Sequence, residues 1–297
     1  MFIMLVEQFL NYLKSERNYS VKTLDAYGKD LTEFESFFRN LDSHLEWNTL
    51  DSDIIRDWME MMMDKGNIAT SVNRRLSALR SFYRFLLSRN LVDVDPAHCV
   101  SGPKKKRSLP SFFRESEMDD VLDESRWELG DYDQLRIRTI LLLFYSTGIR
   151  IAELICLDDD KVDFDASQIK VLGKRNKERI VPFGTDLKDA LYNYKSMRDE
   201  IILRKSKAFF LTKKGFRLTD ALVRKEVKDK LSLVTTLKKH SPHVLRHTFA
   251  TAMLNHGAGL ESVKKILGHE SLNATEIYTH TTFEQLKNVY KSAHPRD

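Results

Sequence analysis

The segment from Ser241 to His280 constrains this chain most strongly, because helical patterns and turn signals alternate along it. Ser241 and Pro242 are typical of a helix start, since serine suits the N-cap and proline the first helical position. Glycines near position 257 end this helix, Gly268 ends a second one, and Ser271 begins a third. The segment therefore predicts three short helices joined by tight turns.

Basic and histidine side chains gather in the same segment. His243 and Arg246 are three positions apart, so they share one helix face near its N-terminus. Backbone N–H groups and the helix dipole favour an anion at such a terminus. His269 follows the second helix, and Tyr278 belongs to the third. The pattern predicts a basic, histidine-rich anion site with one tyrosine beyond it.

The first hundred residues carry four helical patterns of apolar side chains, at 1–13, 20–38, 51–66 and 70–87. Ser20 fits the N-cap of the second helix, and Asp51 or Ser52 opens the third. Only 6 Pro and 11 Gly occur among the 297 residues, which favours a mostly helical chain. At this length we expect two domains or one large domain.

The second half begins after a linker, SGPKKKRSLP, at residues 101–110. The apolar segment Leu135 to Tyr145 predicts a central helix, which ends at Gly148. Arg150 follows this turn between two isoleucines, so we expect it to be anchored and partly buried beside a structural carboxylate or a functional anion. Gln168 to Phe183 alternates apolar and polar residues around a turn, which predicts a β-hairpin. The expected fold class is mainly α with a small β-hairpin or sheet.

Several other classes of protein are disfavoured. No apolar run is long enough to span a membrane. The five aspartates between Asp158 and Asp165 lack the glycine and terminal glutamate of an EF-hand, so we expect a solvated turn. Cys99 and Cys156 form no metal-binding pattern and are expected to be reduced core residues, which points to the cytoplasm.

The net charge of +5 is unevenly distributed, since the first hundred residues are slightly acidic and the remainder is basic. Within the acidic part, Ile68 to Val92 holds five arginines and no acid. Such a concentration suggests a polyanion such as DNA, although a solvated helix face explains the charge equally well. The side chains expected to contact DNA are Arg74, Arg75, Ser77, Arg80, Arg84, Lys104, Lys105, Lys106, Arg107, Arg175 and Lys177.

If the anion is a phosphodiester, these residues permit an in-line displacement. Tyr278 is the candidate nucleophile and would form a phosphotyrosyl ester, provided that cations lower the cost of ionising its phenol. Lys174 in the hairpin turn could protonate the departing 5′-oxygen. Arg150 and Arg246 could bind the non-bridging oxygens with paired N–H donors. The histidines could donate hydrogen bonds or exchange the tyrosine proton, so this chemistry requires no metal and no cofactor.

Four motifs resemble those of the tyrosine recombinases, specifically their Xer-type branch. They are TGIRIAEL, VLGKRNKERIVP, SPHVLRHTFAT and LGHESLNATEIYTH. The N-terminal segments FLNYLKSERNYSVKTLDAYGKDLTEF and RRLSALRSFYRFLL also resemble the DNA-gripping helical domain of that family. The resemblance covers nearly the whole chain and implies the catalytic residues Arg150, Lys174, His243, Arg246, His269 and the nucleophile Tyr278.

The resemblance also implies an architecture, namely a two-domain C-shaped clamp around duplex DNA. A SAM-like helical domain at 1–100 and a basic linker at 101–110 would precede a catalytic domain at 111–280. Residues 281–297 would dock on a neighbouring protomer and control its tyrosine. Four protomers would exchange strands at paired sites through a Holliday junction, as a homotetramer or with a paralogous recombinase. A DNA translocase could activate them, on the nucleoid of a bacterial cytoplasm.

Several alternatives share these motifs or this chemistry. An integrase or a DNA invertase of a mobile or phase-variable element would carry the same motifs. A type IB topoisomerase uses similar chemistry without a second site, but the N-terminal helices disfavour it. A non-catalytic DNA-binding protein would not need all six catalytic groups.

Overall fold

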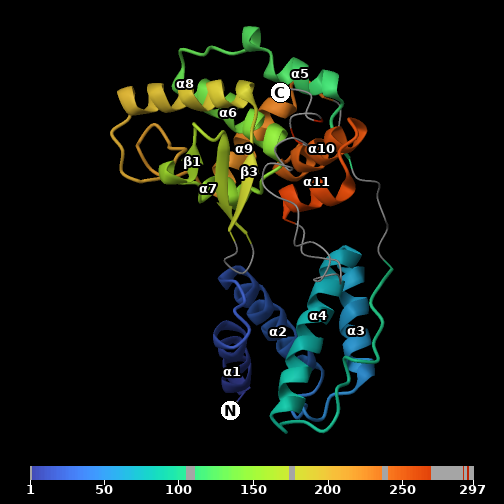
Figure 1. Cartoon of the computed structure of the whole chain (residues 1–297). Coiled ribbons are helices and arrows are strands. Elements are labelled where there is room, and N and C mark those ends of the chain that lie inside the picture. Colours follow the sequence, from blue (N-terminus) through green and yellow to red (C-terminus); the bar gives the residue numbers. More distant parts are fainter. Residues whose placement is uncertain are drawn as a thin grey trace. The chain divides into compact units, whose positions relative to one another are not determined.

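The computed structural model describes residues 2–104, 111–173, 178–235 and 240–268, together with Tyr290 and Ala293. The chain divides into two compact units, Met1–Ser108 and Leu109–Asp297, which are drawn in Figure 1. The first unit is helical, and the second combines helices with one small antiparallel sheet. The predicted mainly α fold with a small sheet is confirmed.

Within the described residues, the first unit contains four helices. They are α1 (Phe2–Ser15), α2 (Val21–Leu41), α3 (Ser52–Asp64) and α4 (Ala69–Ser88). The predicted N-caps hold, because Ser20 accepts a hydrogen bond from the backbone of Thr23 and Asp51 accepts two in the first turn of α3. Helix α4 packs against all three others around a core of aromatic side chains that includes Phe82 and Trp47.

Seven α-helices of the second unit lie within the described residues. They are α5 (Glu115–Leu122), α6 (Tyr132–Thr147), α7 (Ile151–Ile155), α8 (Thr185–Ile201), α9 (Asp220–Leu231), α10 (Pro242–Asn255) and α11 (Leu260–Leu267). Helix α6 is the predicted central helix, since it is buried along almost its whole length and contacts α5, α8, α9 and α10.

The sheet has the strand order β1 (Val162–Asp163), β2 (Gln168–Leu172) and β3 (Glu178–Pro182). Strands β2 and β3 form the predicted hairpin, with Ile169 opposite Val181 and both side chains buried. Of the five residues between these strands, 174–177 lie outside the described part. The sheet packs on the helices through contacts of β2 with α7 and of β3 with α11.

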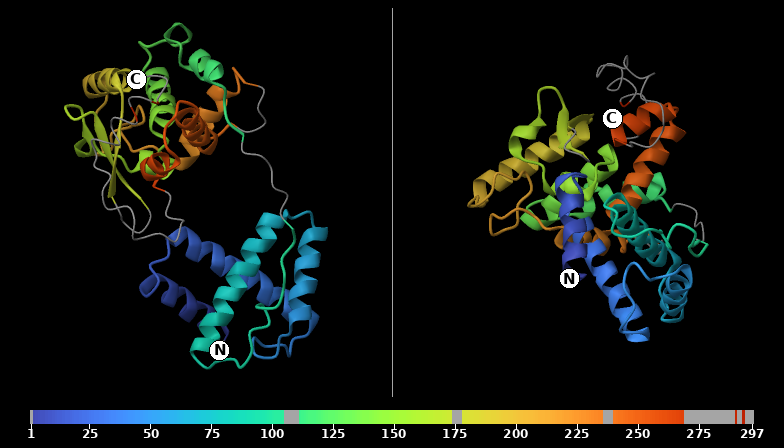
Figure 2. Two further views of the ribbon diagram at one scale, coloured as in Figure 1. Left: turned by 45° about the vertical axis from the view of Figure 1, so that its right-hand side comes forward. Right: turned by 90° about the horizontal axis from the view of Figure 1, so that it is seen from below.

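The turns around the predicted anion site lie at the glycines that predicted the helix ends. Helix α6 ends at Gly148 in the left-handed region (φ 59°), and α11 ends at Gly268 in the same way (φ 64°). Ser241 stands at the N-cap of α10 as predicted, but its side chain makes no capping hydrogen bond. Figure 2 shows α10 and α11 from two further sides, and the two helices are in contact.

The expectation of a solvated turn at 158–165 is wrong for its first two aspartates. Asp158 accepts a hydrogen bond from Arg217 at 2.6 Å and pairs with Lys207 at 3.0 Å. Asp159 accepts bonds from Arg198, whose side chain is fully buried, and from Arg204. These partners are 39 to 59 residues away in the sequence, so a local pattern could not reveal them.

The expectation of two core cysteines is also wrong, because Cys99 and Cys156 are both exposed. Cys156 stands at the C-terminal cap of α7, where the chain leaves the helix. In the part of the chain that the structure describes, none of the helices has the length and apolar character needed to cross a membrane.

Candidate active site

Arg150 is anchored at the start of α7, as the sequence predicts. Its backbone N–H donates to Oε2 of Glu153 at 2.8 Å, and its Nη1 donates to Oε1 at 2.8 Å. The guanidinium group therefore meets a structural carboxylate, while 36 % of the side chain remains exposed. This exposed part is available to an incoming anion.

Glu153 binds a second arginine, Arg179 on β3. Arg179 donates from Nη1 to Oε1 at 2.7 Å and from Nη2 to Oε2 at 2.8 Å. The Glu153 side chain is only 2 % exposed. Burial alone would raise the pKa of Glu153, but the hydrogen bonds from Arg179 and Arg150 lower it below its ordinary value. The carboxylate is therefore ionised at neutral pH.

The C-terminal end of α11 binds three arginines through three consecutive carbonyl groups. Arg179 Nε donates to Ile266 O at 2.8 Å, Arg246 donates to Leu267 O, and Arg150 Nη2 donates to Gly268 O at 3.1 Å. The last carbonyls of a helix lack intrahelical partners and form the negative end of its dipole. This helix end therefore holds the three cations in one place.

Arg246 joins the site from α10. Its Nη1 donates to Gly148 O at 2.5 Å, and its side chain is 7 % exposed. Burial, and then the nearby charge of Arg150, lower the pKa of Arg246 to about 9. The guanidinium group of Arg246 stays protonated at neutral pH. Its hydrogen bonds to the carbonyls of Gly148 and Leu267 nevertheless go to uncharged acceptors. An anion bound beside Arg246 would relieve the cost of this buried charge.

His243 lies one turn before Arg246, and much but not all of its surface is exposed. Partial burial, and then the charges of Arg224 and Arg246, lower the pKa of His243 below its ordinary value. The imidazole is therefore neutral at pH 7 and has one nitrogen that donates and one that accepts. Arg224 on α9 is one of the cations near His243. It was not predicted from the sequence as a residue of the site.

Three of the six predicted catalytic residues, Lys174, His269 and Tyr278, lie outside the described residues. The structure brings together the other three, Arg150, His243 and Arg246, from α7 and α10. In the sequence, His269 directly follows Gly268, whose carbonyl accepts from Arg150.

The arginines of α4, predicted to contact DNA, differ in how they are held. Arg74 pairs with Asp30, which is 3 % exposed. Arg75 contacts Asp30 and Glu33, and its own side chain is 16 % exposed. Ionic contacts within the first unit therefore occupy this end of α4.

Further along α4, the predicted DNA contacts bond main-chain carbonyls and not carboxylates. Arg80 donates to the carbonyls of Ala97 and Val100 and so fixes the chain that follows the helix bundle. Arg84 is exposed and makes one long contact to the Arg80 carbonyl at 3.3 Å. Ser77 is exposed and donates to the Asn73 carbonyl.

The predicted DNA contacts in the linker and the hairpin are mostly not described. Lys104 is exposed. The remaining ones, Lys105, Lys106, Arg107, Arg175 and Lys177, lie outside the described residues.

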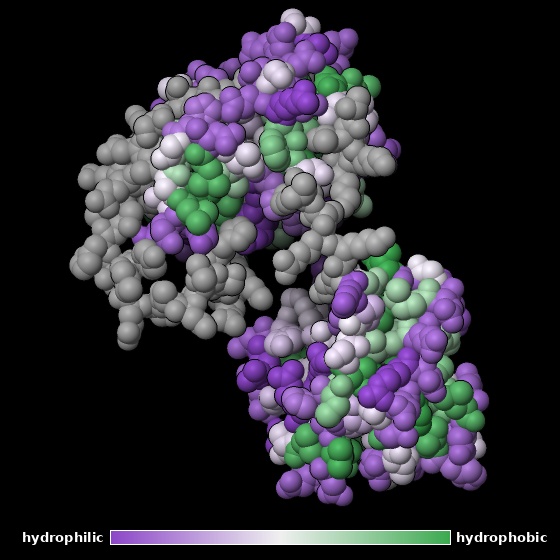
Figure 3. Space-filling model, turned by 90° about the vertical axis from the view of Figure 1, so that its right-hand side faces the viewer, coloured by the Kyte–Doolittle hydropathy of each residue, from purple (hydrophilic) through white to green (hydrophobic). Residues whose placement is uncertain are grey.

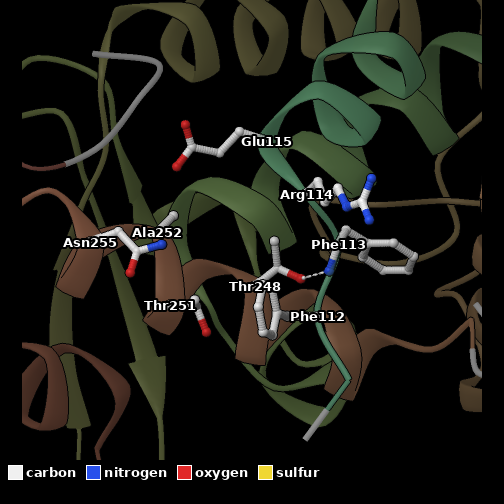
Figure 4. Close-up of a pocket in the computed structure, with 8 residues that line it drawn as sticks. All are labelled: Phe112, Phe113, Arg114, Glu115, Thr248, Thr251, Ala252 and Asn255. Carbon is white, nitrogen blue, oxygen red and sulfur yellow. Dashed lines mark hydrogen bonds between the residues drawn. The ribbon is translucent and has the colours of Figure 1, made fainter.

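A cavity of about 230 Å³ lies where the chain enters the second unit beside α10. Its lining includes Phe112, Glu115, Thr251 and Asn255 (Figure 4). A hydrogen bond of 3.0 Å from the backbone of Phe113 to Thr248 Oγ1 spans 135 positions of the sequence and ties this chain to α10. The cavity lies along α10 beyond the turn that carries the predicted catalytic residues.

On the face seen in Figure 3, the second unit shows a small hydrophobic patch that borders hydrophilic and intermediate residues. Within the described ranges, no group of three or more His, Cys, Asp or Glu side chains could hold a metal ion.

Glu153 and Arg179 were not predicted as residues of the site. The spacing of Arg150 and Glu153, three residues apart at a helix start, is a signal that could have found the glutamate. Arg179 had no such signal, because its partners lie on α7 and α11.

Residues 111–285 match the phage integrase family, and residues 6–90 match the N-terminal SAM-like domain of phage integrases. The chain belongs to this family, the tyrosine recombinases, which are enzymes that break and rejoin DNA in site-specific recombination.

Two relatives show which tyrosine recombinases the chain is similar to. The chain is 40 % identical to the tyrosine recombinase XerC of Listeria welshimeri, over 98 % of both chains. It is 37 % identical to the tyrosine recombinase XerC of Chlorobaculum tepidum, over 97 % of this chain and 94 % of the relative. Among solved structures, the XerH site-specific recombinase bound to a palindromic difH substrate has the same fold, with a TM-score of 0.72 at 22 % identity. That match covers 95 % of this chain and 83 % of the other.

Proposed function

We propose that this recombinase is of the Xer type and resolves chromosome or plasmid multimers at paired sites on duplex DNA. The observation that supports it is the arrangement of Arg150 and Arg246. Both are held by neutral carbonyls at the end of α11, beside one ionised carboxylate that a third arginine shares. Three guanidinium groups around one carboxylate leave a net positive site, which suits a phosphodiester.

In the proposed reaction, the phenol oxygen of Tyr278 attacks the scissile phosphorus and the bond to the 5′-oxygen breaks. Arg150 and Arg246 stabilise the charge on the non-bridging oxygens in the transition state. Lys174 gives a proton to the leaving 5′-oxygen, and His243 and His269 hydrogen-bond the phosphate or exchange the tyrosine proton. The product is a 3′-phosphotyrosyl ester that conserves the bond energy for rejoining. No metal or cofactor takes part in these steps.

The proposal extends to the assembly. Residues 1–100 form a helical DNA-binding domain, 101–110 a basic linker, 111–280 the catalytic domain and 281–297 a segment that docks on a neighbouring protomer. Two sites bring four protomers together, as a homotetramer or with a paralogous recombinase, and strands exchange through a Holliday junction. A DNA translocase activates this complex on the bacterial nucleoid.

The variant Tyr278→Phe tests the chemistry. It lacks the nucleophilic oxygen, so it should form no covalent adduct on a nicked suicide substrate, while sequence-specific binding in a mobility-shift assay is retained. A 3′-phosphotyrosyl adduct that persists in this variant would overturn the assignment of the nucleophile.

The alternative functions can be distinguished by the DNA substrate on which each would act. A type IB topoisomerase would relax supercoiled plasmid that contains no recombination site. An integrase or invertase would recombine sites of a mobile or phase-variable element, whereas the proposed function requires resolution of a dimer at two identical host sites. Mapping the adducts trapped across the host genome would identify those sites.

A further inference from the structure

Arg179 lies where three elements of the second unit meet. It belongs to β3, bonds α7 through Glu153 and bonds the last turn of α11 through Ile266 O. Its side chain is 14 % exposed. None of the steps of the proposed reaction uses this residue, yet its described side-chain hydrogen bonds all go to the elements that hold Arg150 and Arg246.

The contact between Arg179 and Glu153 is a paired one. Both terminal nitrogens of the guanidinium group bind both carboxylate oxygens, at 2.7 and 2.8 Å. This fork-to-fork geometry is the strongest that an arginine and a carboxylate form. Arg150 makes one side-chain bond to the same carboxylate, so Arg179 provides the larger part of its compensation.

Arg179 also supports the turn that receives Arg150. A Cβ added to Gly268 would stand 3.1 to 3.2 Å from Cδ, Nε and Nη1 of Arg179, so the arginine packs directly against this glycine. Gly268 adopts φ 64° and accepts the Nη2 hydrogen bond of Arg150. Arg179 therefore contacts both groups to which the Arg150 side chain is bonded, Glu153 and Gly268.

From this geometry we infer that Arg179 is a positioning residue for DNA cleavage. By pairing with Glu153 and supporting Gly268, it keeps the guanidinium group of Arg150 aimed at the scissile phosphate and leaves its charge free for that phosphate. The inference rests on the proposed role of Arg150.

The physical reason is charge compensation at a carboxylate that is almost fully buried. Without Arg179, the buried Glu153 carboxylate would have Arg150 as its main counter-ion. Coulomb attraction is strong in such surroundings, so Arg150 would be drawn toward Glu153 and would offer less positive potential to the phosphate. Neutralising Glu153 as well would remove this attraction.

A double-mutant cycle of Arg179→Met and Glu153→Gln tests the inference. The readout is the single-turnover rate of covalent adduct formation on a suicide substrate, at saturating protein and below the melting temperature of each variant. Arg179→Met should cleave about 100-fold more slowly, as expected for a displaced catalytic group, with an unchanged Kd for DNA. The double variant should recover at least part of that rate, because the uncompensated carboxylate is gone.

Arg198→Lys and Arg179→Lys form a matched pair of conservative variants. Arg198 is fully buried and, like Arg179, bonds a carboxylate and a carbonyl, those of Asp159 and Phe209, but outside this site. Arg198→Lys should lower thermal stability and leave the cleavage rate of the folded protein unchanged. Arg179→Lys keeps the positive charge but loses the paired hydrogen bonds to Glu153. It should therefore cleave faster than Arg179→Met. If Arg179→Met does not fold, Arg179→Lys is compared with Glu153→Gln/Arg179→Lys in the same cycle.

The outcomes separate the inference from the function on which it rests. Wild-type cleavage by Arg179→Met, or a loss that Glu153→Gln does not relieve, would overturn the positioning role. A wild-type protein that forms no Tyr278 adduct on any recombination site would instead overturn the proposed function, and the inference would fall with it.

Discussion

Arg246 donates from Nη1 to the carbonyl of Gly148 at 2.5 Å, and so joins α10 to the turn that precedes Arg150. The two arginines are 96 positions apart in the sequence but are fixed by the same turn and by the same end of α11. The relative position of these two cations therefore depends on the turn at Gly148 and on the end of α11.

Substitution of Gly148 should disturb this turn. A Cβ there would stand 2.5 Å from Cδ1 of Phe249 and 2.7 Å from Cδ2 of Leu267, and the backbone has φ 59°. Gly148→Ala should lower the free energy of unfolding by about 3 kcal/mol, through strain and overpacking together. Gly257→Ala is the control, because φ is 86° and its Cβ would meet no atom within 4 Å. It should cost about 1 kcal/mol in urea unfolding, and equal losses would contradict the packing argument.

The arginines of α4 should divide into DNA contacts and internal contacts. Arg84 is exposed, so Arg84→Ala should weaken DNA binding and reduce the slope of log K against log salt by about 1. Arg75 is paired with Asp30 and Glu33, so Arg75→Ala should mainly lower the melting temperature. Fluorescence anisotropy across a salt series measures the first effect. If the slope of log K against log salt is unchanged in Arg84→Ala, Arg84 does not contact DNA.

Lys174 should be needed only for a leaving group that requires a proton. Lys174→Ala should slow cleavage of normal DNA by about 100-fold or more, the usual contribution of a general acid. A 5′-thio substrate leaves without protonation, so the variant should cleave it at close to the wild-type rate. Single-turnover assays on the two substrates give the comparison. Equal defects on both would exclude the lysine as the acid.

Glu153 should make stability depend on acid pH. Its folded pKa lies below the unfolded value, so its contribution is present above about pH 4.5 and is lost as the pH falls through the folded pKa. Glu153→Gln should therefore lose less stability than the wild type between about pH 5 and pH 3. Glu226, whose pKa is raised by burial, contributes with the opposite sign, so Glu226→Gln is the control for urea unfolding across this range. A Glu153→Gln curve parallel to the wild type would show that the carboxylate is not held as described.

Local patterns predicted the parts of the fold that local interactions determine. The hairpin of β2 and β3 followed from alternation, and the ends of α6 and α11 followed from Gly148 and Gly268. Strand β1 was not predicted because two residues are too few to show a period. The start of α4 was predicted a residue late, since Ile68 at its N-cap carries no capping side chain.

The site was predictable only in part for the same reason. Arg150 and Arg246 belong to motifs that a reader of the sequence can recognise, but Arg179 acquires its partners only when β3, α7 and α11 come together. Asp158 and Asp159 looked solvated because their arginine partners are distant in the sequence. Charge patterns alone could not separate the paired Arg75 from the exposed Arg84.

The three acceptors at the end of α11 are main-chain carbonyls, those of Ile266, Leu267 and Gly268. No side-chain replacement can delete such an acceptor, so this half of the arrangement is insensitive to most point mutations. Insertions and deletions are different, because one residue added to α11 would rotate the last turn by about 100° and present other carbonyls to the arginines. Among related chains, we therefore expect the length of this helix to vary less than the identity of its exposed residues.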